Sequence, residues 1–346
     1  AGTHGKTTTA SMLAMILEHA GWRPSYLIGG TIAGLGPGAS WQDGAWLVVE
    51  ADESDGTFLE LPAEAAIVTS VEPDHLEHFG GEAQLRSAFS AFVAGPTGPR
   101  LVCADEPGAA ALAGATPGVD RYGTDPEADW RMVDVAVDGT GVSFGVETGG
   151  RRLGPARVSV PGLYNARNAC AALAMATSIG VPFPVASDGL ARFGGVGRLF
   201  EHRGERDGVT YIDDYGHLPG EVRAVLAAAR TGAWSRVVAV FQPHRYSRTE
   251  ALWASFADAF VDADVVVVTG IYASDESPRP GVSGQLVADA VRAAHPGQPV
   301  HYAEGRDELV TVLRSLLRPG DLCLTLGAGD LTALPDVMLQ IPGVGG

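Results

Sequence analysis

The sequence has little lysine, little cysteine and no long apolar run. Lys6 is the only lysine among 346 residues, and all the other basic side chains are arginines. The three cysteines, Cys103, Cys170 and Cys323, lie far apart and form no C-x-x-C motif. This pattern excludes a disulfide framework and a cysteine-based zinc site, and it predicts buried, reduced thiols.

The apolar runs are all shorter than the roughly 18 residues that a membrane-spanning helix needs. The formal net charge of −17 is strongly acidic. Because such a chain repels nucleic-acid backbones and anionic membrane surfaces, we expect it to bind neither. These features predict a cytoplasmic protein, and any phosphate that it binds must be held by local groups.

The chain opens with a phosphate-binding pattern, Gly-Thr-His-Gly-Lys-Thr-Thr. Gly2 and Gly5 permit a tight turn whose N–H groups face an anion, Lys6 can reach the terminal phosphates of a nucleotide, and the Thr7 hydroxyl can bind Mg²⁺. A helix predicted over residues 7–19 directs its positive end at the same place. Such a loop accepts the thin stem of lysine but not the planar group of arginine, so the single lysine at this position supports the interpretation.

Apolar runs alternate with helical patterns, which predicts an α/β fold with mostly parallel sheets. In the first half we predict strands over residues 46–50 and 66–71, helices over 82–93, 106–113 and 165–179, and a small antiparallel part within 129–160. In the second half we predict strands over 209–213, 236–241, 265–269 and 322–326, with helices over 220–230, 249–261, 283–294 and 307–317. The Gly-rich segment 193–198 predicts the boundary between a domain of residues 1–197 and one of residues 198–346.

Polar residues follow the predicted strands of the first half, where ligands of open parallel sheets bind. Glu50 ends one strand and precedes an acidic loop, and His75 follows the next strand. Because Mg²⁺ takes one or two carboxylates together with waters and phosphates, these positions suggest metal sites; a solvated acidic loop and a structural histidine are the alternatives. Further along, Asn165 could cap a helix, whereas Asn168 could equally face a base or a phosphate.

Two motifs follow strands of the second half. Residues 212–217 read Ile-Asp-Asp-Tyr-Gly-His, and residues 241–249 read Phe-Gln-Pro-His-Arg-Tyr-Ser-Arg-Thr. The latter places Arg245 and Arg248 three residues apart at the start of a predicted helix. Each guanidinium can bind a carboxylate through two hydrogen bonds, which favours a carboxylate clamp, with surface salt bridges as the alternative.

In their order along nearly the whole chain, these motifs resemble those of the Mur ligase family. The matching segments are GTHGKTTT, EADESDGTFL, EPDH, NxxN, DDYGH, FQPHRYSRT, PGVSG and LTLGAGDL, and the combination of HGKTTT and HRYSRT is specific. The resemblance implies a central ATP-binding domain with a phosphate loop, followed by a Rossmann-like domain that brings the amino acid. It also implies a preceding UDP-sugar-binding domain, which we do not expect in this sequence.

The resemblance further implies roles for individual residues. Those expected to bind ATP are Gly2, Thr3, Gly5, Lys6, Thr7, Thr8, Asn168, Arg198 and Asp214, with Asn168 toward the adenine and Asp214 toward the ribose. Two Mg²⁺ sites are implied, one at Thr7 and Glu50 and one at His75. The residues implied in catalysis are Lys6, Glu50, His75, His217, His244 and Arg245. Those implied around the incoming amino acid are Tyr215, His217, Arg245 and Arg248.

The implied activity is that of an ATP-dependent, ADP-forming amide ligase of peptidoglycan precursor synthesis. The DESDGTFL segment favours addition of L-alanine to UDP-N-acetylmuramic acid through an acyl phosphate, and we expect the chain to be inactive without a UDP-sugar-binding domain. A ligase that attaches a tripeptide to the same sugar is the alternative within the family. A phosphate-loop kinase or ATPase, or a nucleotide-binding remnant without catalysis, is the alternative outside that activity.

Overall fold

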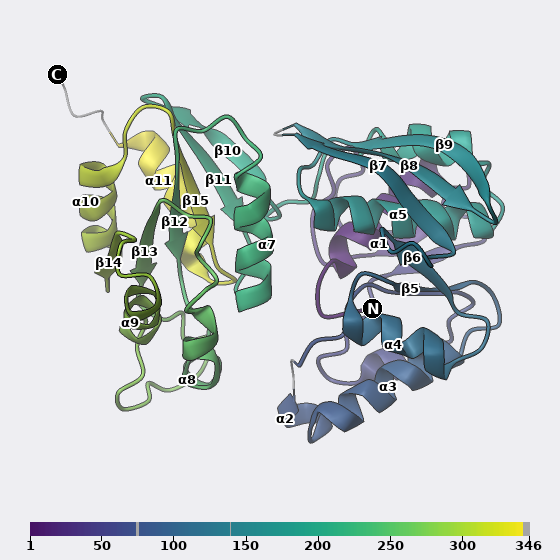
Figure 1. The fold of residues 1–346 in the computed structure, drawn as a ribbon, viewed down its shortest axis with the longest axis horizontal. Coiled ribbons are helices and arrows are strands. Elements are labelled where there is room, and N and C mark those ends of the chain that lie inside the picture. Colours follow the sequence, from purple (N-terminus) through teal and green to yellow (C-terminus); the bar gives the residue numbers. More distant parts are fainter. Residues whose placement is uncertain (74–75, 139, 342–346) are drawn as a thin grey trace. The chain divides into compact units, whose positions relative to one another are not determined.

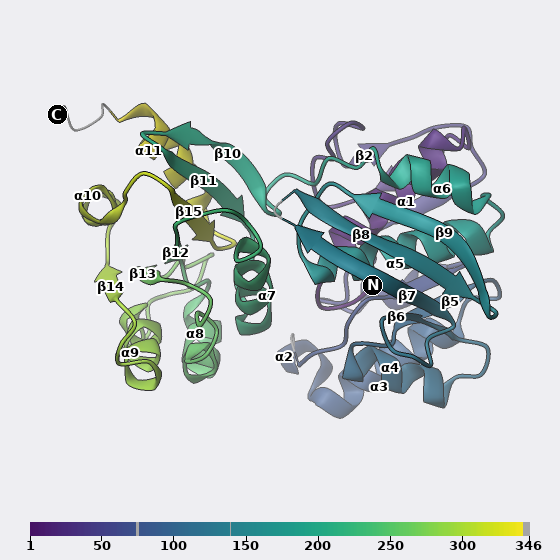
Figure 2. The same ribbon diagram turned by 45° about the horizontal axis from the view of Figure 1, so that its top comes forward.

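The computed structural model describes residues 1–73, 76–138 and 140–341, which belong to two compact units, Ala1–Val196 and Gly197–Gly346 (Figures 1 and 2). Each unit combines helices with a mostly parallel sheet, so the predicted α/β class is confirmed. Among the described residues, no helix is both long enough and apolar enough to cross a membrane.

The first unit contains a six-stranded sheet of order β4-β5-β6-β7-β8-β9. The first four strands are parallel: β4 (Ala66–Val68), β5 (Arg100–Cys103), β6 (Asp120–Gly123) and β7 (Trp130–Asp138). Two antiparallel strands follow, β8 (Gly141–Thr148) and β9 (Arg151–Val158). This confirms the predicted small antiparallel part. A separate three-stranded sheet consists of β2 (Ala39–Ser40), β1 (Ser25–Leu27) and β3 (Leu47–Val49).

Two helices form the centre of this unit. Helix α5 (Leu163–Ser178) packs on strands of the six-stranded sheet, and α1 (Lys6–His19) packs on α5 and on α6 (Phe183–Leu190) (Figure 1). Alanine dominates the buried residues of α5, and such small side chains let α1 and the sheet approach it closely. The other helices of the unit are η1 (Thr57–Glu60), α2 (Leu76–Phe79), α3 (Glu82–Ala94) and α4 (Pro107–Ala115).

The second unit is a single six-stranded sheet with helices on both faces. Its strands, in spatial order, are β10 (Glu201–Arg206), β11 (Val209–Asp214), β15 (Asp321–Leu326), β12 (Arg236–Phe241), β13 (Val265–Thr269) and β14 (Val300–Ala303). All are parallel except β10, an antiparallel edge strand. The helices are α7 (Pro219–Ala229), α8 (Tyr246–Leu252), η2 (Trp253–Phe256), α9 (Gln285–Ala294), α10 (Arg306–Leu316), η3 (Asp330–Ala333) and α11 (Leu334–Gln340). One apolar core lies on each face of the sheet.

Some predicted elements differ from those observed. The strand predicted over 66–71 ends at Val68, because the backbone of residues 69 and 70 bonds to the first residues of the chain instead. The helix predicted over 249–261 is wrong: α8 covers Tyr246–Leu252, and tighter turns follow that bury Phe256 and Phe260. Asn165 does not cap α5, because the helix already begins at Leu163.

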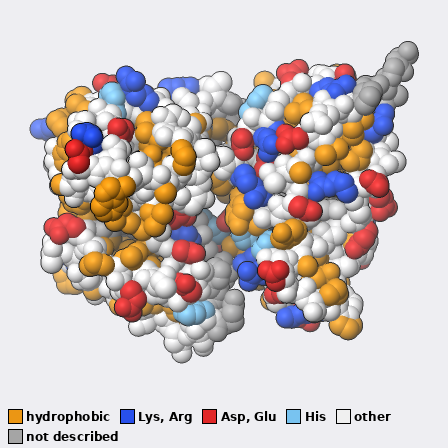
Figure 3. All heavy atoms as spheres, turned by 180° about the vertical axis from the view of Figure 1, so that it is seen from behind, with side chains coloured by type: hydrophobic (Ala, Val, Ile, Leu, Met, Phe, Trp, Pro, Cys, Tyr) orange, Lys and Arg blue, Asp and Glu red, His pale blue; other side chains and the backbone are white. Residues whose placement is uncertain are grey.

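On the face drawn in Figure 3, charged side chains of both signs are interspersed on each unit. Many arginines lie in exposed ion pairs, for example Arg86 with Glu82 and Arg152 with Asp134, each at 2.7 Å. Pairs of this kind stabilise a fold by only about 0–1 kcal/mol each, because water screens both charges. These surface ion pairs therefore contribute little to the stability of either unit.

Candidate functional site

The first residues of the chain form a loop that is hydrogen-bonded to the segment following β4. Thr3 donates its backbone N–H to the Ser70 carbonyl at 3.1 Å, and His4 donates its N–H to the Ser70 hydroxyl at 2.8 Å. Gly2 lies at φ +134°, and a Cβ atom there would be 2.3 Å from the Thr69 hydroxyl oxygen. Glycine is therefore required at position 2 both by its backbone angle and by the close approach of the segment that follows β4.

Gly5 links this loop to α1 in a left-handed conformation, φ +78° and ψ 0°. A Cβ atom at Gly5 would lie 2.5 Å from Oδ1 of Asn168, which is buried in α5. The structure thus places the Asn168 amide directly against the loop. No side chain caps α1 among the described residues, so its first N–H groups can receive an anion, and Thr8 is buried in its first turn.

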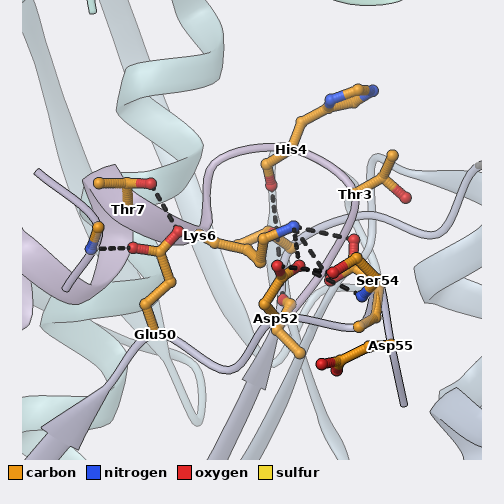
Figure 4. A network of polar contacts seen from close by, with 12 residues as sticks. Thr3, His4, Lys6, Thr7, Glu50, Asp52, Ser54 and Asp55 are labelled. Carbon is orange, nitrogen blue, oxygen red and sulfur yellow. Dashed lines mark hydrogen bonds and ion pairs between the residues drawn. The ribbon is translucent and has the colours of Figure 1, made fainter. Parts of the chain in front are cut away.

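Thr7 and Glu50 lie together, as the metal prediction requires. The Thr7 hydroxyl donates to Glu50 Oε1 at 2.7 Å, and the Gly29 N–H donates to Oε2 at 2.7 Å (Figure 4). A hydroxyl beside a carboxylate fits Mg²⁺, which completes its octahedron with waters and phosphate oxygens. No group of three or more His, Cys, Asp or Glu side chains converges on one point within the described residues. His75, the predicted ligand of a second Mg²⁺, lies outside these residues.

Lys6 has a partner that the sequence did not identify. Its ammonium group donates to Oε1 and Oε2 of Glu53 at 2.8 and 3.0 Å, and it lies 3.7 Å from Asp52 Oδ1. Figure 4 shows the lysine side chain reaching along the loop toward this acidic segment. Glu53 is only 2% exposed. The acidic run after Glu50 was the available signal, but it does not tell which carboxylate turns inward.

Arg198 lies at the start of the second unit, with φ +64°. Its guanidinium donates to the carbonyl oxygens of Gly327 and Gly329 at 3.0 and 3.2 Å, and it lies over the Tyr215 ring with Cζ 4.9 Å from the ring centre. These contacts join the start of the unit to the loop after β15. The phosphate contact that the resemblance implies for Arg198 stays a prediction.

Asp214 ends β11 with a buried carboxylate. Phe200 and Gly216 donate their backbone N–H groups to its two oxygens, each at 2.7 Å. Burial raises the pKa of Asp214 from 3.8 to about 7, although these two hydrogen bonds act in the opposite direction. The carboxylate therefore fixes the backbone at the start of this unit. A ribose contact would have to share its oxygens, and that contact stays a prediction.

Four aromatic rings form a continuous array at the carboxyl ends of β11, β12 and β13. The ring centres of Tyr215 and His217 are 5.3 Å apart, and those of His217 and His244 are 5.6 Å apart. Tyr272 stacks on His244, and their ring centres are also 5.6 Å apart. The structure thus brings the predicted residues Tyr215, His217 and His244 together. Tyr272 comes from the loop after β13, and no motif pointed to it.

His244 is a neutral ring at physiological pH. Its pKa falls from 6.5 to about 4, mainly because the ring is buried and in part because of the nearby His217, Arg248 and Arg245. A guanidinium nitrogen of Arg248 lies 3.2 Å from His244 Nδ1. Because arginine only donates hydrogen bonds, Nδ1 accepts this one and the ring proton resides on Nε2. His244 can therefore offer a hydrogen-bond donor to a ligand.

Arg245 and Arg248 both lie at the start of α8, as the motif predicts. Arg245 precedes the helix with φ +67°, is exposed, and donates its backbone N–H to the Tyr272 carbonyl at 2.8 Å. Arg248 is half-buried beside His244. Two guanidinium groups thus lie near the aromatic array, and their use as a carboxylate clamp stays a prediction.

Comparison with known proteins matches both units. The family described as "Mur ligase middle domain" matches residues 1–176, and "Mur ligase, glutamate ligase domain" matches residues 197–329. Two similar curated proteins are named UDP-N-acetylmuramate–L-alanine ligase. The one from Agrobacterium fabrum is 42% identical and the one from Anaeromyxobacter sp. is 45% identical, and in each case the match covers 99% of this chain and 75% of the relative.

This chain is also similar in structure to a solved protein with the same name as these relatives. The UDP-N-acetylmuramate-alanine ligase MurC from Thermotoga maritima matches with a TM-score of 0.80 at 27% identity, over 98% of this chain and 73% of that one. A murein peptide ligase from Psychrobacter arcticus has the same fold, with a TM-score of 0.68 at 23% identity, over 99% of this chain and 77% of that one. The family resemblance seen in the sequence motifs is confirmed: the chain belongs to the Mur ligase family.

Proposed function

We propose that this chain supplies the ATP-binding and amino-acid-binding units of a ligase that joins L-alanine to UDP-N-acetylmuramic acid. The observation that carries the proposal is the identity above 40%, across nearly the whole chain, with curated proteins named for this reaction. We further infer that the protein acts in the cytoplasm, where ATP is available, and that a second Mg²⁺ binds near His75.

The proposed reaction has two steps. A carboxylate oxygen of the sugar attacks the γ-phosphorus of ATP, which forms an acyl phosphate and releases ADP. The alanine amine then attacks the acyl carbon, a C–N bond forms, the amine loses a proton, and inorganic phosphate leaves. Negative charge builds up on phosphoryl and acyl oxygens in both steps, so the reaction requires positive groups that are already in place.

The first unit supports the phosphoryl step. Lys6 and the N-terminal N–H groups of α1 would bind the β- and γ-phosphates, as is typical of a loop of this type. Mg²⁺ held by Thr7 and Glu50 would offset charge on the same phosphates. Gly2, Gly5 and Asn168 support this role indirectly, because their close packing fixes the loop.

The second unit supports the amino-acid step. Arg245 and Arg248 would bind the alanine carboxylate and leave its amine free to attack, which lowers the entropic cost of the reaction. His244 is neutral and donates from Nε2, so it adds a hydrogen bond without attracting a second anion. Tyr215 and His217 extend the same aromatic surface.

The test is phosphate release in the presence of ATP, Mg²⁺ and UDP-N-acetylmuramic acid. The chain spans 75% of its curated relatives, so the remaining part would be supplied from the Agrobacterium fabrum relative. We expect release that depends on L-alanine and falls at least about 100-fold in Lys6→Ala and in Arg245→Ala. Arg23→Ala is the matched control, because Arg23 is exposed and its ion pair with Asp43 lies on the surface.

The acceptor decides between the candidate activities. L-alanine, glycine, L-serine and the cell-wall tripeptide would be compared at equal concentration. Release with the tripeptide alone would identify a ligase that attaches whole peptides, and release that no acceptor stimulates would leave only an ATPase. Either result would overturn the proposal.

A further inference from the structure

The single lysine is held by a buried carboxylate. The Lys6 ammonium donates to both oxygens of Glu53, and the exposed fractions of the two side chains are 15% and 3%. The arginine pair Arg86–Glu82 on the surface has about half of each side chain exposed. A carboxylate as buried as Glu53 is stable only when a positive group compensates it. The pair of Lys6 and Glu53 is therefore part of the packed structure of the loop, unlike an exposed ion pair on the surface.

This arrangement limits what Lys6 can offer to a nucleotide. An ammonium group has three N–H donors, and two of them point at Glu53. Asp52 places a further carboxylate oxygen 3.7 Å from the same nitrogen. A phosphate oxygen that approaches Lys6 must therefore compete with Glu53 for the hydrogen bonds of the ammonium group.

We propose that Glu53 is a positioning residue that acts through Lys6: it holds the ammonium at the loop and weakens the loop's affinity for ADP, so that the product can leave. The inference rests on the proposed nucleotide site at this loop. Interactions that bind substrate and product equally well do not accelerate the chemical step, and they slow product release. The Glu53 carboxylate lowers the affinity of the loop for ADP and still keeps Lys6 in place. We therefore expect it to increase the rate of turnover.

Glu53→Gln is the informative variant, because glutamine keeps the size and one acceptor oxygen but removes the charge. We expect the variant to bind ADP about tenfold more tightly, because the Lys6 ammonium is then held less strongly by its neighbour and can give stronger hydrogen bonds to a phosphate. In the complete enzyme, both kcat and the KM for ATP should fall. A structural defect in the loop would instead raise this KM.

A double-mutant cycle tests whether the effect passes through Lys6. ADP binding to the chain would be measured calorimetrically in the presence of MgCl₂ for wild type, Glu53→Gln, Lys6→Met and the double variant. We expect the tightening to disappear in the Lys6→Met background. Asp52→Asn is the matched control, and it should change ADP affinity by only about twofold because its carboxylate is exposed and further away.

Two outcomes would overturn the inference: weaker ADP binding by Glu53→Gln, or the same change with and without Lys6. If thermal unfolding shows that Glu53→Gln does not fold, Glu53→Asp serves instead. It shortens the side chain by one methylene, and it should tighten ADP binding by about two- to threefold. These measurements need no acceptor, so their result is separate from the question of whether L-alanine is the substrate.

Discussion

Ionisation of Asp214 should make the second unit less stable as the pH rises. Both carboxylate oxygens accept hydrogen bonds from backbone N–H groups. The pKa rises from 3.8 to about 7, mainly because the group is buried and in smaller part because of Glu221 and Asp213. The folded unit therefore retains a proton at pH values at which the unfolded chain has lost it. The stability that this proton contributes is complete below about pH 4 and is lost as the pH rises to about 7.

The magnitude follows from the two pKa values. The difference between 3.8 and about 7 corresponds to about 4 kcal/mol between the acidic and alkaline limits. The part that falls between pH 5 and pH 8 is about 2–3 kcal/mol. Asp214→Asn cannot ionise, and it loses one of the two hydrogen-bond acceptors at a cost of about 1–3 kcal/mol at every pH. The free energy of unfolding of wild type minus that of the variant should therefore fall by about 2–3 kcal/mol across this range.

The assay is urea unfolding of both proteins at pH 5, 6, 7 and 8. Hydrogen-exchange mass spectrometry on peptides from residues 197–341 would isolate the transition of the second unit. His244 has its own pH dependence of opposite sign, because burial lowers its pKa to about 4, but this contribution is common to both proteins and cancels in the difference. A difference that stays constant within about 0.5 kcal/mol, or that increases with pH, would refute the reasoning.

Two further predictions concern the first unit's loop and the thiols. Gly5→Ala should weaken ADP binding more than about tenfold, because φ +78° costs a non-glycine residue about 1–2 kcal/mol and the new Cβ would lie 2.5 Å from Asn168. Gly21→Ala, at φ +76° with open space around it, is the control for the backbone angle, and equal losses in both variants would refute the packing argument. The three cysteines are buried, and burial raises the pKa of each thiol. They should not react with a thiol reagent in the folded protein and should all react in urea, and any fast-reacting thiol in native buffer would contradict this burial.

The sequence predicted the strands that consist of a continuous apolar run. It did not predict strands that form mainly because other strands, far away in the sequence, pair with them. The strands β12 and β13 were predicted over their observed bounds, because each is a continuous run of valine-rich sequence that the parallel sheet buries on both faces. The sequence did not predict β5 or β14, whose short segments RLVC and VHYA each contain a polar side chain that interrupts the apolar pattern. Such short strands are stabilised by partners far away in the sequence, so local pattern carries little information about them.

The same distinction applies to the candidate site. Spacing identified Lys6, Thr7 and Glu50, because a loop followed by a helix and the end of a strand are local features. It did not identify Glu53 as the partner of Lys6, or Tyr272 as the neighbour of His244. These contacts join segments separated by tens of residues, and only packing determines which side chain of a loop turns inward.

The pair of Lys6 and Glu53 also gives a reason why lysine persists at one position of a chain that otherwise uses arginine. A guanidinium binds a carboxylate through two parallel hydrogen bonds in a fixed plane, and this geometry is among the strongest ion pairs in proteins. An arginine at position 6 would have the same buried carboxylate within reach and would be held on it. The ammonium of lysine has no fixed plane, so it can rotate to keep one bond with Glu53 while another N–H turns to a phosphate. Both the narrow loop and its buried counter-charge therefore select lysine.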